Sequence, residues 1–280
     1  MNVLLRRPPV RSLALDDRRA WRGTSVLEGE LRELGVRAGR VLVVHASLRG
    51  LGLGFEAGAV VSALRSLLGA EGTLVVPTHT AGNSDTSALF RRAVEGMTTA
   101  EIAAHKAGMS AFDRATTPSQ GMGRLAETVR VLPEAVRSAH PQTSFAAVGA
   151  RAAELMEGHD PRCHLGESSP LAKLYEADAD ILLLGVGYDR CTAFHLGEYR
   201  YCASPPRRRY RCVVDFGQGA QWWEYEDVEL DASDMAQLGA EYERSGNVAI
   251  GRVGQAECRL ISMPGAVDFA TRWYAMRRKV

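Results

Sequence analysis

Three short apolar runs divide the first two thirds of the chain and predict buried strands. They cover residues 41–44, 73–76 and 181–184, are rich in Val, Ile and Leu, and are bounded by Gly, Pro or polar residues. Residues 56–68, between the first two runs, carry apolar side chains at helical spacing, and Gly69 follows as a natural helix end. This strand–helix–strand order predicts that the first two strands are parallel.

Weaker signals of the same kind complete the fold prediction. Helices are expected at residues 122–130, 150–156, 171–176, 192–201, 233–244 and 264–277. Strands are expected at residues 144–148 and 257–262, with a hairpin formed by residues 212–216 and 221–226. We therefore expect a single α/β domain over residues 1–280. A central mixed, partly parallel sheet would be flanked by helices, and the C-terminal part would be more antiparallel.

Two segments lack these signals. Residues 1–20 are expected to form an N-terminal tail. Residues 81–119 are polar and weakly periodic, which predicts a long excursion with one helix, and excursions of this length often carry function.

The composition narrows the class of protein. The 280 residues include 34 Lys and Arg against 33 Asp and Glu, so the formal net charge of +1 argues against a nucleic-acid or membrane-surface binder. No apolar run approaches the length of about 20 residues that spans a membrane, and the N-terminus lacks the apolar core of a signal peptide. The five cysteines are odd in number and form no C-x-x-C pair, which favours reduced thiols and a cytoplasmic location over disulfides or zinc.

Three motifs resemble known ligand-binding patterns, but the rest of the sequence does not support a binding site at any of them. Residues 52–57 fit the dinucleotide pattern G-x-G-x-x-A, but no acidic residue ends the second strand to hold a ribose, so a nicotinamide site stays a minor alternative. His159, Cys163 and His164 match no usual zinc spacing, and no metal site is expected. Residues 207–209, three arginines after a Pro-Pro pair, are interpreted as a solvated surface loop, with an anion contact as the alternative.

The residues from 185 to 198 carry the clearest chemistry. A glycine-rich turn follows a predicted strand, Thr192 is a plausible N-cap, and His195 and Glu198 lie three positions apart on one helical face. A carboxylate beside an imidazole can orient it to act as a general base. A core histidine that only stabilises the fold is the alternative. His45 ends the first predicted strand and is either part of the same site or an anchor for its loop.

Nine motifs, taken in order, resemble the aminoglycoside 3-N-acetyltransferase family, which is distinct in fold from the GNAT superfamily. They are V-H-A-S-L-R (44–49), G-T-L-V-V-P-T (72–78), T-P-S (117–119), M-G-R-L-A-E (122–127), R-S-A-H-P (137–141), S-F-A-A-V-G (144–149), S-P-L (169–171), L-L-G-V-G (183–187) and F-H-L-G-E (194–198). The family's usual H-L-A-E reads H-L-G-E here, so Gly197 either loosens the helix or makes room beside it.

The resemblance implies acetyl transfer from acetyl-CoA to the 3-amino group of the 2-deoxystreptamine ring of an aminoglycoside antibiotic. The expected catalytic residues are His195, acting as general base, with Glu198 and His45. Coenzyme contacts are expected from His45, Ala46, Ser47, Leu48, Arg49, Val76, Thr78, His140 and Ser144. Substrate contacts are expected from Asp85, Asp189, Glu224 and Asp227, because acidic side chains attract a polycationic drug.

The same resemblance sets the expected partners and leaves other functions open. Acetyl-CoA and a small-molecule aminoglycoside are expected, with no nucleic acid, membrane or metal, and a homodimer stays open. The alternatives are an N-acetyltransferase of the same fold that acts on another amine, such as a biosynthetic intermediate, and a CoA-binding protein without catalysis. We also expect separated local charges, basic near the coenzyme and acidic near the acceptor.

Overall fold

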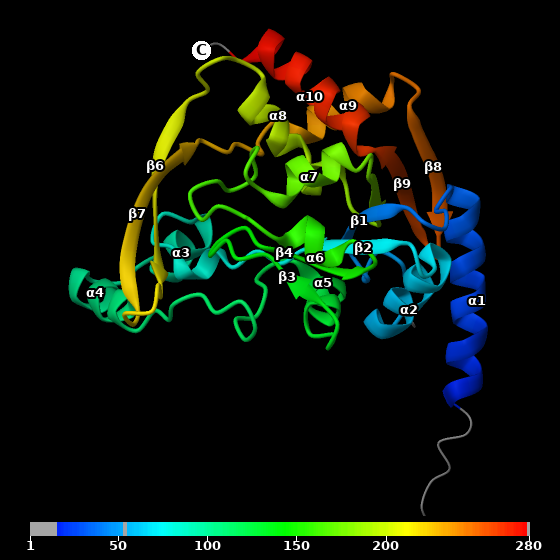
Figure 1. Ribbon diagram of the computed structural model, residues 1–280, viewed down its shortest axis with the longest axis horizontal. Helices are drawn as coiled ribbons and strands as arrows, with labels where there is room; N and C mark the ends of the chain where they lie inside the picture. Colours follow the sequence, from blue (N-terminus) through cyan, green and yellow to red (C-terminus); the bar gives the residue numbers. More distant parts are fainter. Residues whose placement is uncertain (1–15, 53–54, 279–280) are drawn as a thin grey trace, which may run out of the picture.

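A seven-stranded mixed sheet forms the centre of the protein (Figure 1). The computed structural model describes residues 16–52 and 55–278, and its sheet has the strand order β3-β4-β2-β1-β5-β9-β8. The three apolar runs form its middle strands, β1 (Val41–Ala46), β2 (Thr73–Pro77) and β5 (Asp180–Leu184). β1 pairs in parallel with both neighbours, so the predicted parallel pair is confirmed.

The outer strands are antiparallel, which makes the sheet mixed as predicted. On one side β4 (Phe145–Gly149) pairs with β2, and the short β3 (Val136–Arg137) pairs with β4. On the other side β9 (Ala256–Ser262) pairs with β5, and β8 (Val248–Val253) forms the edge. β8 was not predicted, because most of its side chains are at least partly exposed and it has no continuous apolar run.

Helices cover both faces of the sheet, and the alternation of side chains along β1 assigns residues to each face. Leu42 and Val44 belong to one core, Val41 and Val43 to the other. The first core is completed by α1 (Asp16–Leu34), α2 (Ala57–Leu68) and α5 (Gly123–Arg130). The second is completed by α6 (Ala152–Met156), α7 (Pro170–Glu176), α8 (Phe194–Arg200), α9 (Met235–Glu243) and α10 (Met263–Arg277). Because side chains alternate, His45 lies on the face that α8 covers.

The two segments without clear signals differ from the prediction. Residues 16–20, expected in the tail, begin α1, and residues 1–15 lie outside the described residues. The excursion over residues 81–119 contains two helices rather than one, α3 (Ala88–Ala93) and α4 (Thr99–Ala107), after a 3-10 turn at Ala81–Asn83. α4 buries none of its residues, so it carries no apolar face that could have predicted it.

The predicted hairpin is longer than expected. β6 (Arg207–Val214) and β7 (Gln221–Val228) form a separate two-stranded ribbon, which Figure 1 shows curving past α3. The three arginines at residues 207–209 therefore lie in a strand, not in a surface loop. Arg209 lies opposite Glu226 in the ribbon, and its Nη1 is 3.3 Å from Oε1 of the diagonal neighbour Glu224. The N-cap of α8 is Ala193 rather than Thr192, since a 3-10 turn at Tyr188–Arg190 places the start of the helix later.

Candidate active site

The carboxyl ends of three parallel strands meet at one edge of the sheet and bring the predicted site residues together. β1 ends at His45 and Ala46, β2 leads into Thr78 and His79, and β5 leads into a turn that begins at Gly185. The antiparallel β4 starts at the same edge, because Pro77 pairs with Phe145. This edge is where open α/β sheets place their ligands.

A histidine–glutamate pair on α8 is the best-defined polar feature of this edge. His195 Nδ1 lies 2.6 Å from Glu198 Oε2, and Glu198 has no exposed surface. The other carboxylate oxygen accepts a hydrogen bond from the Asp231 N–H at 2.9 Å and pairs with Arg278 at 2.5 Å. Arg278 also pairs with Asp234 at 2.7 Å. These contacts hold the buried carboxylate, and through it the imidazole, in one orientation.

The hydrogen bond to Glu198 decides the tautomer of His195. The carboxylate accepts, so the proton lies on Nδ1 and Nε2 keeps its lone pair. Nδ1 is the ring nitrogen that contacts the protein, Nε2 forms no hydrogen bond with a described residue, and 15% of the side chain is exposed. The ring therefore presents a free basic nitrogen to a ligand at the sheet edge.

Gly197 makes room beside the helix and does not loosen it. A Cβ at this position would lie 2.9 Å from the Cβ of Ala270 and 3.1 Å from the backbone nitrogen of Thr271. α10 therefore packs directly on the backbone of α8, between His195 and Glu198. This close packing accounts for the departure from the family's alanine.

Five histidines, named the buried-histidine group here, lie on the sheet edge or against it; four of them are buried and His79 is partly exposed. They are His45, His79, His140, His159 and His164. Burial lowers the pKa of His45 to about 4. Burial, and after it the electrostatic interactions with His195, His45, His159 and Arg137, lower the pKa of His79 to about 3. His79 was not predicted as a site residue, because a single histidine after a strand has no distinguishing local signal.

The other three members of the group stack on one another behind the sheet edge. The His140 ring centroid lies 4.8 Å from that of His159 and 4.6 Å from that of His164. His140 Nδ1 accepts from the backbone N–H groups of Gln142 and Thr143, both at 3.0 Å. Nδ1 of His140 is thus occupied by protein donors, so the ring proton lies on Nε2, which is buried and has no partner among the described residues.

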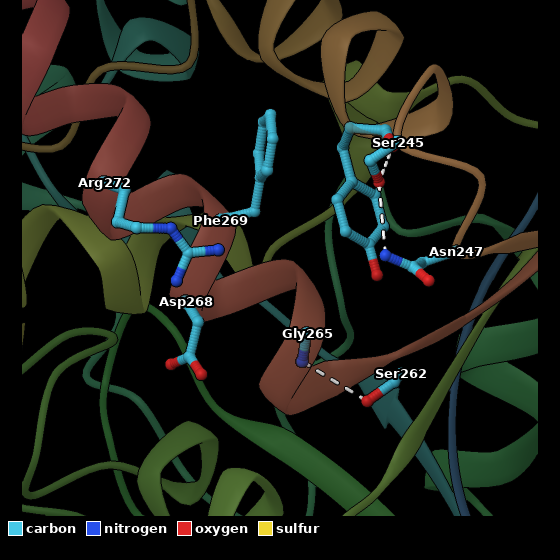
Figure 2. A pocket seen from close by; sticks show the side chains of 8 residues that line it. Ser245, Asn247, Ser262, Gly265, Asp268, Phe269 and Arg272 are labelled. Carbon is cyan, nitrogen blue, oxygen red and sulfur yellow. Dashed lines mark hydrogen bonds between the residues drawn. The ribbon is translucent and has the colours of Figure 1, made fainter.

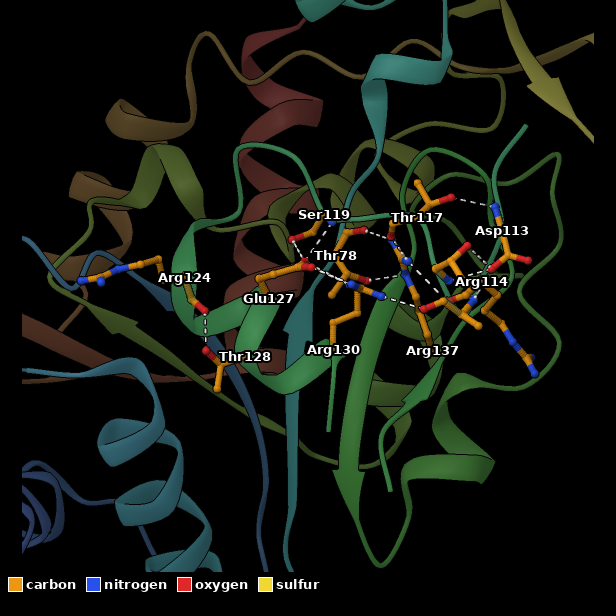
Figure 3. Close-up of polar contacts among 12 residues, drawn as sticks. Thr78, Asp113, Arg114, Thr117, Ser119, Arg124, Glu127, Thr128, Arg130 and Arg137 are labelled. Atoms are coloured by element: carbon orange, nitrogen blue, oxygen red, sulfur yellow. Dashed lines mark hydrogen bonds and ion pairs between the residues drawn. The ribbon is translucent and has the colours of Figure 1, made fainter. Parts of the chain in front are cut away.

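Thr78 and Ser144, both predicted coenzyme contacts, are tied together by the buried Arg137. Figure 3 shows this arginine beside Thr78 and Thr117. Arg137 donates from Nε to Ser144 Oγ at 3.1 Å and from Nη2 to the Thr78 carbonyl at 2.8 Å. It also donates to the Thr117 carbonyl at 2.5 Å. Among the described residues Arg137 forms no ion pair, and burial lowers its pKa to about 10. Arg137 therefore connects the ends of β2 and β4 with the segment at residues 81–119.

The loop after β1 holds most of the remaining predicted coenzyme residues. The Ser47 N–H donates to the Leu184 carbonyl at 2.9 Å, which continues the β1–β5 ladder to the site edge. Ala46 is partly exposed and Arg49 is exposed, whereas Leu48 is buried in the core. Val76 is fully buried on the opposite face of the sheet, so only its backbone faces the edge.

The acidic residues predicted to bind substrate already have protein partners. Asp85, whose side chain is 8% exposed, pairs with Lys106 at 2.7 Å. Glu224 pairs with Arg209, as described above, and the half-exposed Asp189 pairs with its neighbour Arg190 at 3.0 Å. Asp227 is 3% exposed and accepts from the His164 N–H and from the Tyr199 hydroxyl. Its burial raises its pKa, and its contacts are those of a structural residue.

A polar hollow of about 480 Å³ between α9 and α10 lies apart from these residues (Figure 2). Asp268, Phe269 and Arg272 line it from α10, and Ser245 and Asn247 face them. None of the predicted site residues lines this hollow.

The described part of the chain holds no group of three or more His, Cys, Asp or Glu side chains that is suited to a metal. It also has no helix that is both long and apolar enough to cross a bilayer.

Comparison with known proteins agrees with this architecture. Residues 43–275 match the family model described as aminoglycoside 3-N-acetyltransferase. The chain is 35% identical over 247 residues to the prophage-derived aminoglycoside N(3')-acetyltransferase-like protein YokD of Bacillus subtilis, covering 88% of this chain and 89% of that protein. It is 38% identical over 264 residues to aminoglycoside N(3)-acetyltransferase III of Serratia marcescens, covering 88% and 95%.

Solved structures show the same fold. The crystal structure of YokD has a TM-score of 0.85 and 32% identity, over 92% of this chain and 95% of that chain. The structure described as AAC-IIIb binary with CoASH has a TM-score of 0.79 and 26% identity, over 91% and 96%. The fold and the relatives therefore define an acyltransferase. The chain belongs to the aminoglycoside 3-N-acetyltransferase family, as its motifs indicated.

Proposed function

We propose that the protein transfers the acetyl group of acetyl-CoA to an amine, with His195 as general base. The observation that carries this proposal is the 2.6 Å contact between His195 Nδ1 and the buried Glu198 carboxylate. Glu198 keeps the proton on Nδ1, so the Nε2 lone pair takes a proton from the attacking amine nitrogen. That nitrogen forms a bond to the thioester carbonyl carbon. The carbon–sulfur bond then breaks, and the CoA thiolate accepts the proton from the imidazolium.

The coenzyme side of the proposal rests on the loop at residues 45–49. The Ser47 N–H is already bound to the β5 strand, so the loop has a fixed start at the carboxyl edge. The exposed Arg49 supplies a positive charge without an ion-pair partner among the described residues, which suits a coenzyme that carries phosphates. A family member with CoASH bound has the same fold.

The first acceptor to consider is the 3-amino group of the 2-deoxystreptamine ring of an aminoglycoside, as the family name suggests. A second candidate is another small amine. The pairing of Asp85 with Lys106 and of Glu224 with Arg209 favours this second candidate, because a paired carboxylate attracts a polycation less strongly.

Thiol release from acetyl-CoA tests the chemistry. The assay combines the protein with a panel of aminoglycosides and simple amines, for the wild type and for His195→Ala. We expect the variant to lose at least about 100-fold in kcat, and added imidazole to restore part of the rate. Glu154→Gln is the matched control, because Glu154 is an exposed carboxylate on α6 in an ion pair with Arg151, the N-cap of that helix. Undiminished turnover in His195→Ala would exclude His195 as the base.

The acceptor panel separates the two candidates. Release of thiol with 2-deoxystreptamine drugs, and acetylation of the 3-amine by mass spectrometry and NMR, would establish the first. Release only with other amines would establish the second. Binding of acetyl-CoA without thiol release for any amine would indicate a CoA-binding protein without catalysis.

A further inference from the structure

At the carboxyl edge of the sheet, the buried His45 and the partly exposed His79 each have a buried ring nitrogen without a protein partner. Nε2 of His45 and Nε2 of His79 are both inaccessible to water and accept or donate no hydrogen bond among the described residues. His45 lies in β1 and His79 follows the neighbouring β2, so the two rings belong to adjacent strands at the carboxyl edge. Both interact electrostatically with one another, and His79 also does so with His195. Buried polar atoms without a partner are uncommon and call for an explanation.

The partnerless Nε2 atoms decide where the ring protons lie. An imidazole that remains neutral carries one N–H donor and one lone pair. An orphaned buried N–H is rarer, and costs more, than an orphaned acceptor. In His140, whose Nε2 is also buried without a partner, two backbone N–H groups donate to Nδ1 and force the proton onto Nε2. No such donor among the described residues reaches Nδ1 of His45 or His79, so in these two rings the proton lies on Nδ1. Unlike Nε2, neither Nδ1 is a buried atom without a partner, and no described residue forms a hydrogen bond with it, so each ring keeps its Nδ1–H donor for a ligand.

The structure holds the His79 donor firmly in place. The Thr78 N–H donates to the Ser144 carbonyl at 2.8 Å, and the Thr80 N–H donates to the Gln142 carbonyl at 2.9 Å, one on each side of His79. The His79 carbonyl accepts from the Gln120 N–H at 2.7 Å. Its ring meets Phe145 edge to face, with centroids 5.6 Å apart. The backbone and the ring are thus both fixed before any ligand arrives, which is what electrostatic stabilisation of a transition state requires.

We infer that His79 and His45 form a pair of neutral imidazole donors for the carbonyl oxygen of the acetyl thioester. This inference rests on the proposed acetyl transfer. As the amine nitrogen attacks the carbonyl carbon, the electron pair of the C=O bond moves to the oxygen, and the two Nδ1–H groups stabilise the negative charge. When the C=O bond re-forms, the thiolate leaves and neither histidine has lost or gained a proton. Because both rings stay neutral near pH 7, they do not compete with His195 for the proton of the amine.

Four substitutions test this role, because two side-chain amides mimic different ring nitrogens. Asparagine places its amide near the position of Nδ1, glutamine near that of Nε2, and leucine keeps volume without a donor. We expect His79→Leu and His79→Gln to lose about 100-fold in kcat, the usual scale for one oxyanion donor, and His79→Asn to stay within about tenfold. His45→Leu should behave as His79→Leu does. The acidic limb of the pH–rate profile should persist in all four, since His195 is the base.

The outcomes distinguish this inference from the proposed function. If the wild type transfers acetyl groups and His79→Leu turns over within threefold of it, the donor role is refuted while the acetyltransferase stands. Equal rates for His79→Asn and His79→Gln also refute it, and this comparison remains if the leucine variant does not fold. Loss of the acidic limb in His79→Asn would make His79 the base instead. If the wild type acetylates no amine, both the donor role of the two histidines and the proposed acetyltransferase function are refuted.

Discussion

The substitution Glu198→Gln tests the central contact of the site with almost no change in shape. The carbonyl oxygen of the glutamine can still accept from the Asp231 N–H and from Arg278, which fixes the direction of the side chain. Its NH2 group then faces His195 Nδ1, at a place where the wild type has a carboxylate oxygen 2.6 Å away. An amide donates there, so Nδ1 must accept and the proton moves to Nε2. The ring would then present a donor where the reaction needs a base.

The size of the effect follows from this reversal. The wrong tautomer and the loss of the negative charge that stabilises the imidazolium act together, and the matching Asp→Asn change in serine-protease triads costs about 10⁴-fold. We expect kcat to fall by about 10³-fold, which corresponds to about 4 kcal/mol in the activation free energy. The free energy of unfolding should fall by only about 1–2 kcal/mol, because Arg278 keeps its ion pair with Asp234.

Thiol release from acetyl-CoA measures the rate, and urea unfolding measures the stability. Glu154→Gln serves again as the control and should change neither, because its side chain is 60% exposed. Nitrogen-15 NMR of the imidazole reports the tautomer directly, with the Nδ1–H form in the wild type and the Nε2–H form in the variant. A folded Glu198→Gln protein that turns over within threefold of the wild type would refute the reasoning.

Three further predictions concern stability. Between pH 6.5 and about 4 the unfolded chain binds protons that the buried-histidine group does not bind in the folded state, so the free energy of unfolding must fall as the pH falls through this window. Equal urea midpoints at pH 7 and pH 5 would contradict this. Gly197→Ala should lower Tm, because the new Cβ would be overpacked against Ala270, at a cost of about 1–3 kcal/mol. We expect this cost to exceed the gain in helix propensity of about 1 kcal/mol. The second substitution Ala270→Gly should then restore Tm. An unchanged Tm would show that α10 moves aside freely. Arg137→Lys should cost about 2–4 kcal/mol in urea unfolding, because an ammonium cannot reach the Thr78 carbonyl, the Thr117 carbonyl and the hydroxyls together. A loss below about 0.5 kcal/mol would mean that the guanidinium fork is not needed.

Local patterns were enough to predict the middle of the sheet and the His195–Glu198 pair. β1, β2 and β5 are buried on both faces, so their sequences are continuous apolar runs that can be recognised without the fold. The pair is three residues apart on one helix, and that spacing alone places both side chains on one face. The capping box of Thr98 and Glu101 at the start of α4 was also a local signal, and it could have predicted this helix without an apolar face.

The parts that were not predicted depend on contacts between residues far apart in the chain. The edge strand β8 is stabilised by β9 rather than by an apolar run of its own. Nothing near Asp85 in the sequence shows that Lys106 neutralises it, and nothing near Glu198 shows that Arg278 holds it, 80 positions away. His79 lies next to the end of β1, where His45 is, only because β1 and β2 pair in the sheet.

The sequence by itself thus determined which segments are buried, which helix carries the His195–Glu198 pair, and which family the motifs resemble. These features follow from side-chain periodicity within a few residues. Only the tertiary structure decided which carboxylates are already paired, why position 197 is glycine, and which imidazoles stay neutral. Those properties depend on the distance between groups and on their burial. Electrostatic and hydrogen-bond energies are set by the atoms that surround a group in space, and these atoms often belong to residues far away in the sequence.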